Sequence, residues 1–403
     1  EPLSFFRYFW DKVSAAGGEP GRHFAVITDP GTPLVDLAEE RGFRRVFEAP
    51  PDVGGRYSAL TVFGLVPAAL IGVDVDKLLD RAWTMAEAAA FCVAEPDNPA
   101  LGLGAALGEL ARNGKDKATF LVSSSLAAFP GWAEQLIAES TGKDGTGILP
   151  VADEPAGPPE VYGPDRFFVY LWHGADDDSE QRQRIEALEA VGHPVARIRL
   201  DLTEDLGQEM FRSEVAVAAA GAVLGIHPFN QPDVQLAKDL ARQAMTGELD
   251  GGAAVEETRV DDSDALASAV REWVDTARPG DYGALQAYLA PTAETTQVLQ
   301  RIRLGLRDRL RVATTLGYGP RFLHSTGQLH KGGPPTGLFL QLVDEPARDL
   351  DVPETDYSFG KLIEAQALGD FQALQQRERR VLRVRLGSDV VAGLGQLGGV
   401  FDG

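Results

Sequence analysis

The sequence has only one cysteine and no apolar run long enough to cross a membrane. A disulfide within the chain is impossible for Cys92 alone, which excludes a disulfide-stapled fold and a cysteine-based zinc ribbon and fits the reducing cytoplasm. The two longest apolar stretches, residues 60–73 and 215–226, fall short of the roughly 20 residues that span a bilayer. We therefore expect both to be core segments of a cytoplasmic protein, with no membrane partner.

Basic charge is also scarce, since 38 basic residues stand against 60 acidic ones in 403 residues, for a formal net charge of −22. Such an acidic surface argues against a nucleic-acid partner or an anionic lipid surface. A small basic pocket is still compatible with it, because a pocket depends on local charge. The six histidines show no HExxH spacing, and the glycines of residues 101–108 lie within a predicted helix, so we expect no metal and no nucleotide cofactor.

Segments of strand length alternate with segments of helix length along most of the chain. This alternation is typical of parallel sheets covered by helices on both faces, so the expected fold class is α/β. The predicted strands include residues 23–28, 119–123, 167–172, 195–200, 337–343 and 380–386.

The best internal boundary is the stretch 152–165, which is rich in proline, glycine and acidic residues. It predicts a first lobe at 1–151, a linker at 152–165, a second lobe at 166–386 and a loose tail at 387–403. Residues 247–264 are acidic and rich in glycine, and we expect them to form an exposed excursion.

A pair of glycines precedes an arginine in the segment VGGRYS at residues 53–58. Glycine at Gly55 lets the backbone approach a ligand closely, and the guanidinium group of Arg56 can stabilise negative charge that develops during a reaction. The alternative is a tight turn with a surface arginine. The spacing alone does not decide between the two.

Gln135 and Glu139 are four residues apart in a predicted helix at 130–142, so they share one face of it. Glu139 lies in the last turn, where the helix dipole disfavours a carboxylate and raises its pKa toward that of a useful general base. The alternative is a solvated Gln/Glu face, which the residues by themselves favour over the base role.

A third polar segment, residues 228–238, opens a predicted helix with Pro232 in its first turn. Gln231 and Lys238 are seven residues apart, which places them two turns apart on one side of a helix. Both side chains could face a cleft, and the alternative is an amphipathic helix with an exposed lysine.

The fourth segment, residues 323–333, holds His324, Gln328, His330 and Lys331 among glycines. Polar side chains at this density in a predicted loop are often binding groups. A lone histidine is usually structural, and the cluster makes the two interpretations about equal.

Together the four segments resemble phosphoglucose isomerases, which interconvert glucose 6-phosphate and fructose 6-phosphate. The motifs are VGGRYS, QxxxESxGK at 135–143, FNQxxVQxxK at 229–238 and LHSxGQ at 323–328. The overall texture, including ITDPGTP at 27–33, is most similar to the isomerase half of bifunctional transaldolase/phosphoglucose isomerases. The resemblance implies two sugar-isomerase-type, doubly wound lobes with mainly parallel sheets and a site between them.

The resemblance also implies the chemistry of the site. Glu139 would be the base that moves a proton between C1 and C2 through a cis-enediol, and Arg56 would stabilise the enediolate, with Gly55 close to the substrate. The substrate would be a hexose 6-phosphate, and the reaction needs no metal and no redox cofactor.

Four further roles follow from the same resemblance. His324 and Lys238 would assist ring opening, and Gln135 and Gln231 would position the sugar or its phosphate. In common family members the histidine precedes the lysine motif, whereas His324 follows it here. Asp233 stands where the lysine motif usually has a small residue.

Family members carry a phosphate-binding loop that ends just before a Glu-Pro pair, and this sequence begins at Glu1-Pro2. We therefore expect these residues alone to bind glucose 6-phosphate weakly and an upstream segment to restore binding and turnover. A homodimer and a fused upstream transaldolase domain are compatible with the resemblance. The competing interpretation is a non-catalytic phosphosugar-binding module or regulator on the same lobes, and Glu139 beside Gln135 favours the enzyme.

Overall fold

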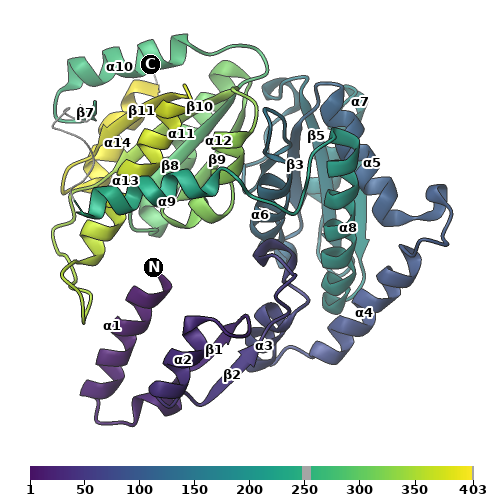
Figure 1. Ribbon diagram of the computed structural model, residues 1–403. Coiled ribbons are helices and arrows are strands. Elements are labelled where there is room, and N and C mark those ends of the chain that lie inside the picture. Colours follow the sequence, from purple (N-terminus) through teal and green to yellow (C-terminus); the bar gives the residue numbers. More distant parts are fainter. Residues whose placement is uncertain (247–255, 402–403) are drawn as a thin grey trace.

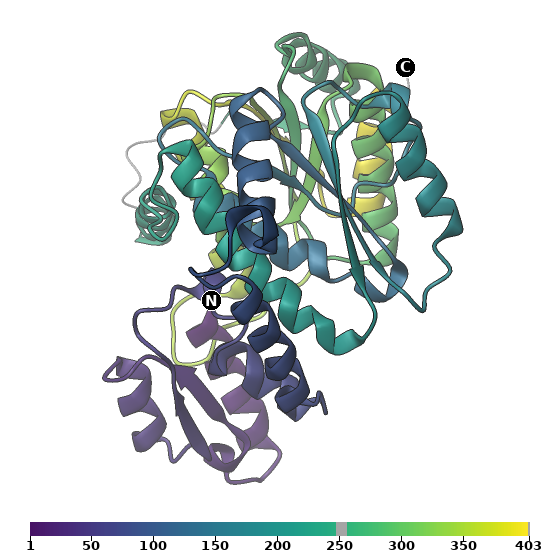
Figure 2. The same ribbon diagram turned by 90° about the vertical axis from the view of Figure 1, so that its right-hand side faces the viewer.

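The computed structural model describes residues 1–246 and 256–401. Within these residues the chain forms three sheets, of two, four and five strands, and every pairing between these strands is parallel. The four- and five-stranded sheets lie side by side, and a smaller N-terminal unit lies below them (Figures 1 and 2). None of the helices in the described ranges is both long and apolar enough to cross a bilayer.

The N-terminal unit pairs strand β1 (Ala25–Thr28) with β2 (Arg45–Glu48) between helices α1 (Pro2–Ala15) and α2 (Pro33–Glu40). Both helices begin with proline, which suits a first-turn position because its missing N–H would be unpaired there in any case. Four aromatic rings fasten α1 to the unit, with centroids 5.4–6.1 Å apart: Phe6, Trp10, Phe24 and Phe43.

The four-stranded sheet has the order β4-β3-β5-β6. Its strands are β3 (Lys117–Val122), β4 (Leu149–Val151), β5 (Arg166–His173) and β6 (Val195–Leu200). One face packs on α5 (Pro99–Arg112), α6 (Phe129–Thr141) and α8 (Leu206–Leu224), and the other packs on α7 (Ser179–Ala190). The strand order reverses between β3 and β5, as in a doubly wound sheet.

Helices α5 and α8 cross closely because glycines line their contact. A Cβ atom on Gly104 would lie 2.4 Å from the carbonyl oxygen of Ala216, and one on Gly108 would lie 2.6 Å from Cβ of Val223. The glycines of residues 101–108 therefore serve helix packing inside a helix that begins at the N-cap Asn98.

The five-stranded sheet has the order β7-β11-β10-β8-β9. Its strands are β7 (Thr258–Arg259), β8 (Tyr282–Tyr288), β9 (Ala313–Tyr318), β10 (Gly337–Val343) and β11 (Arg380–Arg385). The covering helices are α10 (Ser263–Asp275), α11 (Ala293–Leu310) and α14 (Val390–Phe401) on one face and α12 (Gly327–Gly332) and α13 (Phe359–Gln376) on the other, with α9 (Val234–Thr246) packed against α13. The central strands β8 and β10 are buried along their whole length, as is typical of a parallel sheet covered on both faces.

The predicted α/β class with mainly parallel sheets is confirmed, but the predicted domain boundaries differ from the structure. Residues 152–165 connect β4 to β5 inside one sheet, and β5 pairs with β3 from Lys117↔Arg166 onward, so this stretch does not separate two lobes. Of the predicted loose tail 387–403, residues 402–403 lie outside the described residues, and the rest is not loose, because α14 buries Leu394 and Leu397 against the core of the five-stranded sheet. The small residues of this stretch let α14 pack closely against the sheet.

The predictions for the two apolar stretches and for the acidic stretch have different outcomes. The stretch 60–73 is not a core segment: it forms α3 (Val62–Leu70), in which no residue is buried, before α4 (Val75–Ala88), and Leu70 and Ile71 are more than four-fifths exposed. The stretch 215–226 is a core segment as expected, within α8. Of the predicted excursion 247–264, residues 247–255 lie outside the described residues, and the rest contains β7 and the start of α10.

A buried ionic network joins the two larger sheets. Glu154, which follows β4, accepts hydrogen bonds from Arg166 Nη2 of β5 at 3.0 Å and from the backbone and hydroxyl of Thr314 in β9 at 3.0 and 2.6 Å. Arg303 of α11 donates to the carbonyls of Ala152 and Asp153 at 2.8 Å each. Burial by itself would raise the pKa of Glu154, but the charges of Arg166 and Arg303 outweigh burial and lower it.

We predict that Arg303→Met lowers the free energy of unfolding by about 3 kcal/mol, because it leaves buried carbonyls and part of the Glu154 charge without their partner. Urea denaturation measures this value. The matched control is Arg301→Met on the exposed face of the same helix, with an expected change within about 0.5 kcal/mol. Equal effects of the two substitutions would contradict a joining role for this network.

Candidate active site

A buried arginine lies at the centre of the candidate site. Arg56 belongs to a short 3-10 turn, Gly55–Tyr57, and is only 4% exposed. Its Nε donates to Ser140 Oγ of α6 at 2.8 Å, and its Nη2 donates to the carbonyls of Pro228 and Asn230 at 2.6 and 2.9 Å. A guanidinium group has five N–H donors in one plane, so a single side chain can join its own turn to two other segments in this way.

The remaining nitrogen of Arg56 faces the other predicted residues. Nη1 donates to Gln231 Oε1 at 3.2 Å and lies 3.9 Å from Glu139 Oε2. Gly55 precedes Arg56, and a Cβ atom built on it would meet open space, so no protein atom competes for that position. The structure therefore excludes the interpretation of Arg56 as a surface arginine in a tight turn.

Glu139 lies in the last turn of α6 and is 6% exposed. Gln135, one turn earlier, donates to Glu139 Oε2 at 3.3 Å, so the predicted shared face is confirmed. Burial raises the pKa of Glu139, and the charges of Arg56, His324 and Lys143 and the bond from Gln135 act in the opposite direction. The predicted direction of the pKa shift is right, although its main cause is burial and not the helix dipole.

Neighbouring groups hold this cluster in place. The hydroxyl groups of Tyr57 and Ser140 lie 2.9 Å apart, and the Tyr57 ring lies 5.4 Å from the Arg56 guanidinium group. Below Glu139, Phe129 and Leu136 pack into the core of the four-stranded sheet. The base candidate therefore sits on a rigid helix, as a precise site requires.

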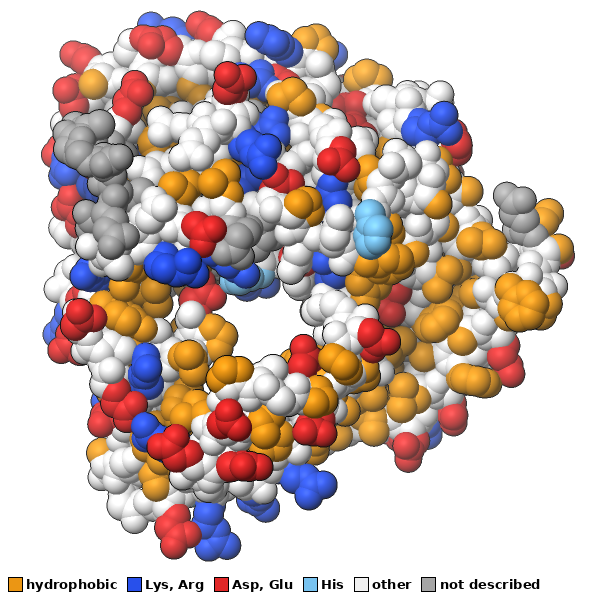
Figure 3. Space-filling model, viewed as in Figure 1, with side chains coloured by type: hydrophobic (Ala, Val, Ile, Leu, Met, Phe, Trp, Pro, Cys, Tyr) orange, Lys and Arg blue, Asp and Glu red, His pale blue; other side chains and the backbone are white. Residues whose placement is uncertain are grey.

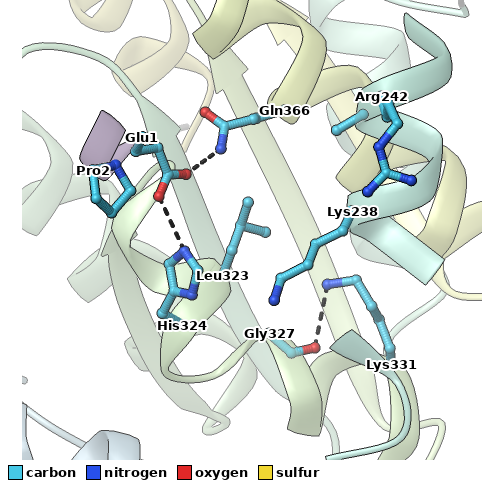
Figure 4. A pocket seen from close by; sticks show the side chains of 10 residues that line it. Glu1, Pro2, Lys238, Arg242, Leu323, His324, Gly327, Lys331 and Gln366 are labelled. Carbon is cyan, nitrogen blue, oxygen red and sulfur yellow. Dashed lines mark hydrogen bonds and ion pairs between the residues drawn. The ribbon is translucent and has the colours of Figure 1, made fainter. Parts of the chain in front are cut away.

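His324 and Lys238 line a cavity of about 370 Å3 between the five-stranded unit and the start of α1 (Figure 4). His324 ends a 3-10 turn after β9, and its Nε2 lies 3.2 Å from Glu1 Oε2. Gln366 of α13 donates to the other oxygen of Glu1. The hydrogen bond with His324 lowers the pKa of Glu1 to about 2, so this carboxylate keeps its charge and fixes the imidazole.

The opposite wall of the cavity is cationic. Lys238 extends into it from α9, Arg242 follows one turn later, and Lys331 of α12 also lines it (Figure 4). Lys331 forms a buried ion pair with Asp370 at 2.6 Å. Figure 3 shows an opening near the middle of the molecule with basic side chains and a histidine along its upper rim. An acidic protein thus keeps a local site for an anionic ligand.

The two halves of the site are electrostatically connected, because a positive charge on His324 lowers the pKa of Glu139. Gln231 and Lys238 do not share a helix, since α9 begins at Val234 and Gln231 precedes it. They point to different groups, Gln231 to Arg56 and Lys238 into the cavity.

The polar segment 323–333 is not the predicted loop, although its His324 and Lys331 line the cavity. Most of it forms helix α12, and Gln328, His330 and Lys331 are all buried. His330 packs between aromatic rings of Tyr282, Phe322 and Phe339, and burial lowers its pKa well below the usual value. This histidine is structural.

Asp233, the departure from the motif, has a structural role. Its backbone N–H donates to Gln328 Oε1 at 2.9 Å and its carboxylate accepts from Gln328 Nε2 at 2.8 Å. It also pairs with Arg377. Asp233 therefore fastens the segment before α9 to α12, next to the site.

Sequence reasoning missed Glu1 and Gln366. Each is an isolated polar residue outside the four motifs, and only the docking of α1 against the five-stranded unit brings them to His324. Tyr57 and Ser140 lie inside the motifs already identified, so their proximity to Arg56 was a signal that could have been used.

Comparisons with known proteins agree with the resemblance. No family model matches the chain. Among curated proteins named glucose-6-phosphate isomerase, one from Rubrobacter xylanophilus is 32% identical across 55% of this chain and 59% of its own length. One from Symbiobacterium thermophilum is 38% identical across 38% of this chain and 34% of its own length. One from Parabacteroides distasonis is 30% identical across 59% of this chain and 62% of its own length.

The chain spans less than two thirds of the length of each of these three relatives. A crystal structure of a hypothetical protein from Thermus thermophilus matches with a TM-score of 0.55 and 26% identity, covering 61% of this chain and 68% of that chain. The similarity to phosphoglucose isomerases that the four motifs indicate is thereby confirmed.

We predict that Gln135→Leu raises the pKa of Glu139 further, because the lost hydrogen bond stabilised the charged carboxylate. A carboxyl-carbon NMR titration of protein labelled at glutamate measures it. The control is Gln208→Leu in α8, which removes a similar bond to Asp205 just before that helix and should leave the pKa of Glu139 unaltered. A pKa of Glu139 that is unaffected by Gln135→Leu would contradict this geometry.

Proposed function

We propose that the chain carries the active site of an aldose–ketose isomerase that interconverts glucose 6-phosphate and fructose 6-phosphate. The observation that carries the proposal is the buried Glu139 carboxylate, with its raised pKa, beside Gln135 and Arg56. A carboxylate of this kind is a suitable base for a proton on carbon next to a carbonyl group. The similarity to proteins named glucose-6-phosphate isomerase supports the choice of substrate.

In the proposed reaction Glu139 removes the proton from C2 of the open-chain aldose and returns it to C1. The C1 carbonyl oxygen becomes the enediolate oxygen and takes up a proton to form the cis-enediol. The O2 hydroxyl then releases its proton and becomes the ketone oxygen as C1 is protonated, so the net change is one proton from C2 to C1 and one from O2 to O1. Burial favours this step, because the carboxylate gains basicity in a poorly solvated place.

Arg56 is suited to stabilise the enediolate. Four of its five N–H groups have acceptors on Ser140, Pro228, Asn230 and Gln231. Among the described residues, the fifth has no hydrogen-bond acceptor, and it belongs to Nη1, the atom 3.9 Å from Glu139. A fixed donor on the side of the base can stabilise negative charge as it develops in the transition state.

The residues that line the cavity are suited to open the sugar ring and to bind the substrate. His324, held by Glu1, would transfer the proton between the ring oxygen and the anomeric hydroxyl, and Lys238 would stabilise the oxygen that carries charge. The cationic wall with Lys238 and Arg242 suits a phosphorylated sugar. The homodimer, the fused transaldolase domain and the cytoplasmic location stay predictions of the resemblance.

A non-catalytic phosphosugar-binding module is the second candidate, and the site supports it less well. A binding module would use the cationic wall of the cavity. It would gain nothing from a carboxylate that is buried at the cost of its hydration.

We predict that Glu139→Gln keeps the shape of the side chain and lowers kcat at least ~100-fold, since the proton acceptor is lost, while glucose 6-phosphate still binds. A coupled isomerase assay and calorimetric titration measure the two quantities. The matched control is Glu209→Gln, another buried glutamate with a raised pKa, located in α8 and paired with Arg212. Turnover by Glu139→Gln at the rate of the control would contradict the base assignment.

For Arg56→Lys we predict a decrease in kcat of about 100-fold and a smaller increase in KM, because the charge matters most when the enediolate forms. Lysine cannot reproduce the planar fork that fixes Ser140 and the 228–230 carbonyls. Steady-state kinetics with thermal unfolding as a check of folding test this. An effect confined to KM would make Arg56 a residue of ground-state binding only.

A further inference from the structure

Lys143 is a buried cation that the proposed reaction does not use. It follows α6 four residues after Glu139, and it is 1% exposed. Its Nζ donates to the backbone carbonyl of His227 at 2.7 Å. Among the described residues, none forms an ion pair with Lys143, which is unusual for a lysine buried to this degree.

The acceptor of Lys143 belongs to the same segment that Arg56 holds. Arg56 donates to the carbonyls of Pro228 and Asn230, so two buried cations bind three carbonyls within the four residues 227–230. The next residue, Gln231, accepts from Arg56 Nη1 at 3.2 Å. The position of this segment therefore determines where Arg56 and Gln231 lie relative to Glu139.

Neighbouring charges act on the pKa of Lys143 in opposite directions. Burial and repulsion by Arg56 lower its pKa to about 8, whereas Glu139 and Asp144 raise it. Lys143 binds the backbone carbonyl of His227, whereas the ring of His227 accepts a hydrogen bond from the backbone N–H of Phe229. In return, the charge of Lys143 lowers the pKa of Glu139, so the lysine and the base affect each other's protonation.

We propose that Lys143 is a positioning residue of the isomerase site: its ammonium group fixes segment 227–230 and thereby sets Arg56 and Gln231 against Glu139. The inference rests on the proposed function and extends it, because it assigns a kinetic role to a residue that does not reach the substrate cavity. A merely structural lysine would contribute to stability and would leave the pH profile of the reaction unchanged.

The test compares Lys143→Met, which keeps the length and removes the charge, with Lys143→Arg, which keeps the charge and does not titrate below about pH 12. The matched control is Lys117→Met, because Lys117 is also 1% exposed but pairs with Asp116 and Asp165 away from the site. For each purified protein, kcat and KM for glucose 6-phosphate are measured from pH 6 to 10, with thermal unfolding to establish the folded fraction.

The unsubstituted protein should lose kcat/KM as the pH rises through about 8, because Lys143 loses its proton there. Lys143→Arg should stay within about tenfold of it at pH 7 and lack this decline. Lys143→Met should lose about 100-fold in kcat/KM, mostly in kcat, as expected for a displaced stabilising group. Lys117→Met should lose stability and keep kcat/KM per folded molecule.

Two results would overturn the inference: a folded Lys143→Met with unchanged kcat/KM, or a Lys143→Arg that keeps the decline near pH 8. If Lys143→Met does not fold, the pH profile of Lys143→Arg decides. If the unsubstituted protein isomerises no glucose 6-phosphate even with the upstream phosphate-binding segment joined to it, the proposed function itself is overturned, which separates the two failures.

Discussion

One buried guanidinium group connects the parts of this protein that meet at the candidate site. Arg56 comes from the turn after the N-terminal unit, Ser140 from a helix of the four-stranded sheet, and the carbonyls of residues 228–230 from the segment that leads to α9. A charge placed this deep is stable only when its N–H groups find acceptors, so the three segments must come together as the chain folds. The base candidate Glu139 is positioned by the same condition.

A second buried network joins the two larger sheets to each other. Glu154, Arg166 and Arg303 lock the edge of the four-stranded sheet to the edge of the five-stranded one. Together with the apolar cluster that packs Ala138, Leu149 and Val151 against the five-stranded unit, it fixes the cavity with His324 and Lys238 relative to Glu139, since the two halves of the site are carried by different sheets. The site is thus held by buried charges in hydrogen-bonded networks and by apolar packing between the two sheets.

The sequence was sufficient for those features that depend on local order. The α/β class, most strands and helices, and the pairing of Gln135 with Glu139 follow from periodicity and spacing within one element. It was insufficient for features that depend on contacts between segments far apart in the sequence. The pairing of β5 with β3 makes residues 152–165 an internal connection, and the core of the five-stranded sheet orders α14 in a stretch that looks like a tail. Likewise Glu1 reaches His324 only through the docking of α1, and no pattern in the sequence encodes that contact.

The central claim is that Glu139 moves a proton between two carbons of a sugar phosphate, and isotope exchange tests it most directly. Fructose 6-phosphate is incubated with the protein in D2O, and the product is analysed by NMR. The account predicts glucose 6-phosphate with deuterium at C2 in at least part of the product, because a proton held by a carboxylate exchanges with solvent. Glucose 6-phosphate that forms without any deuterium at C2 would contradict it.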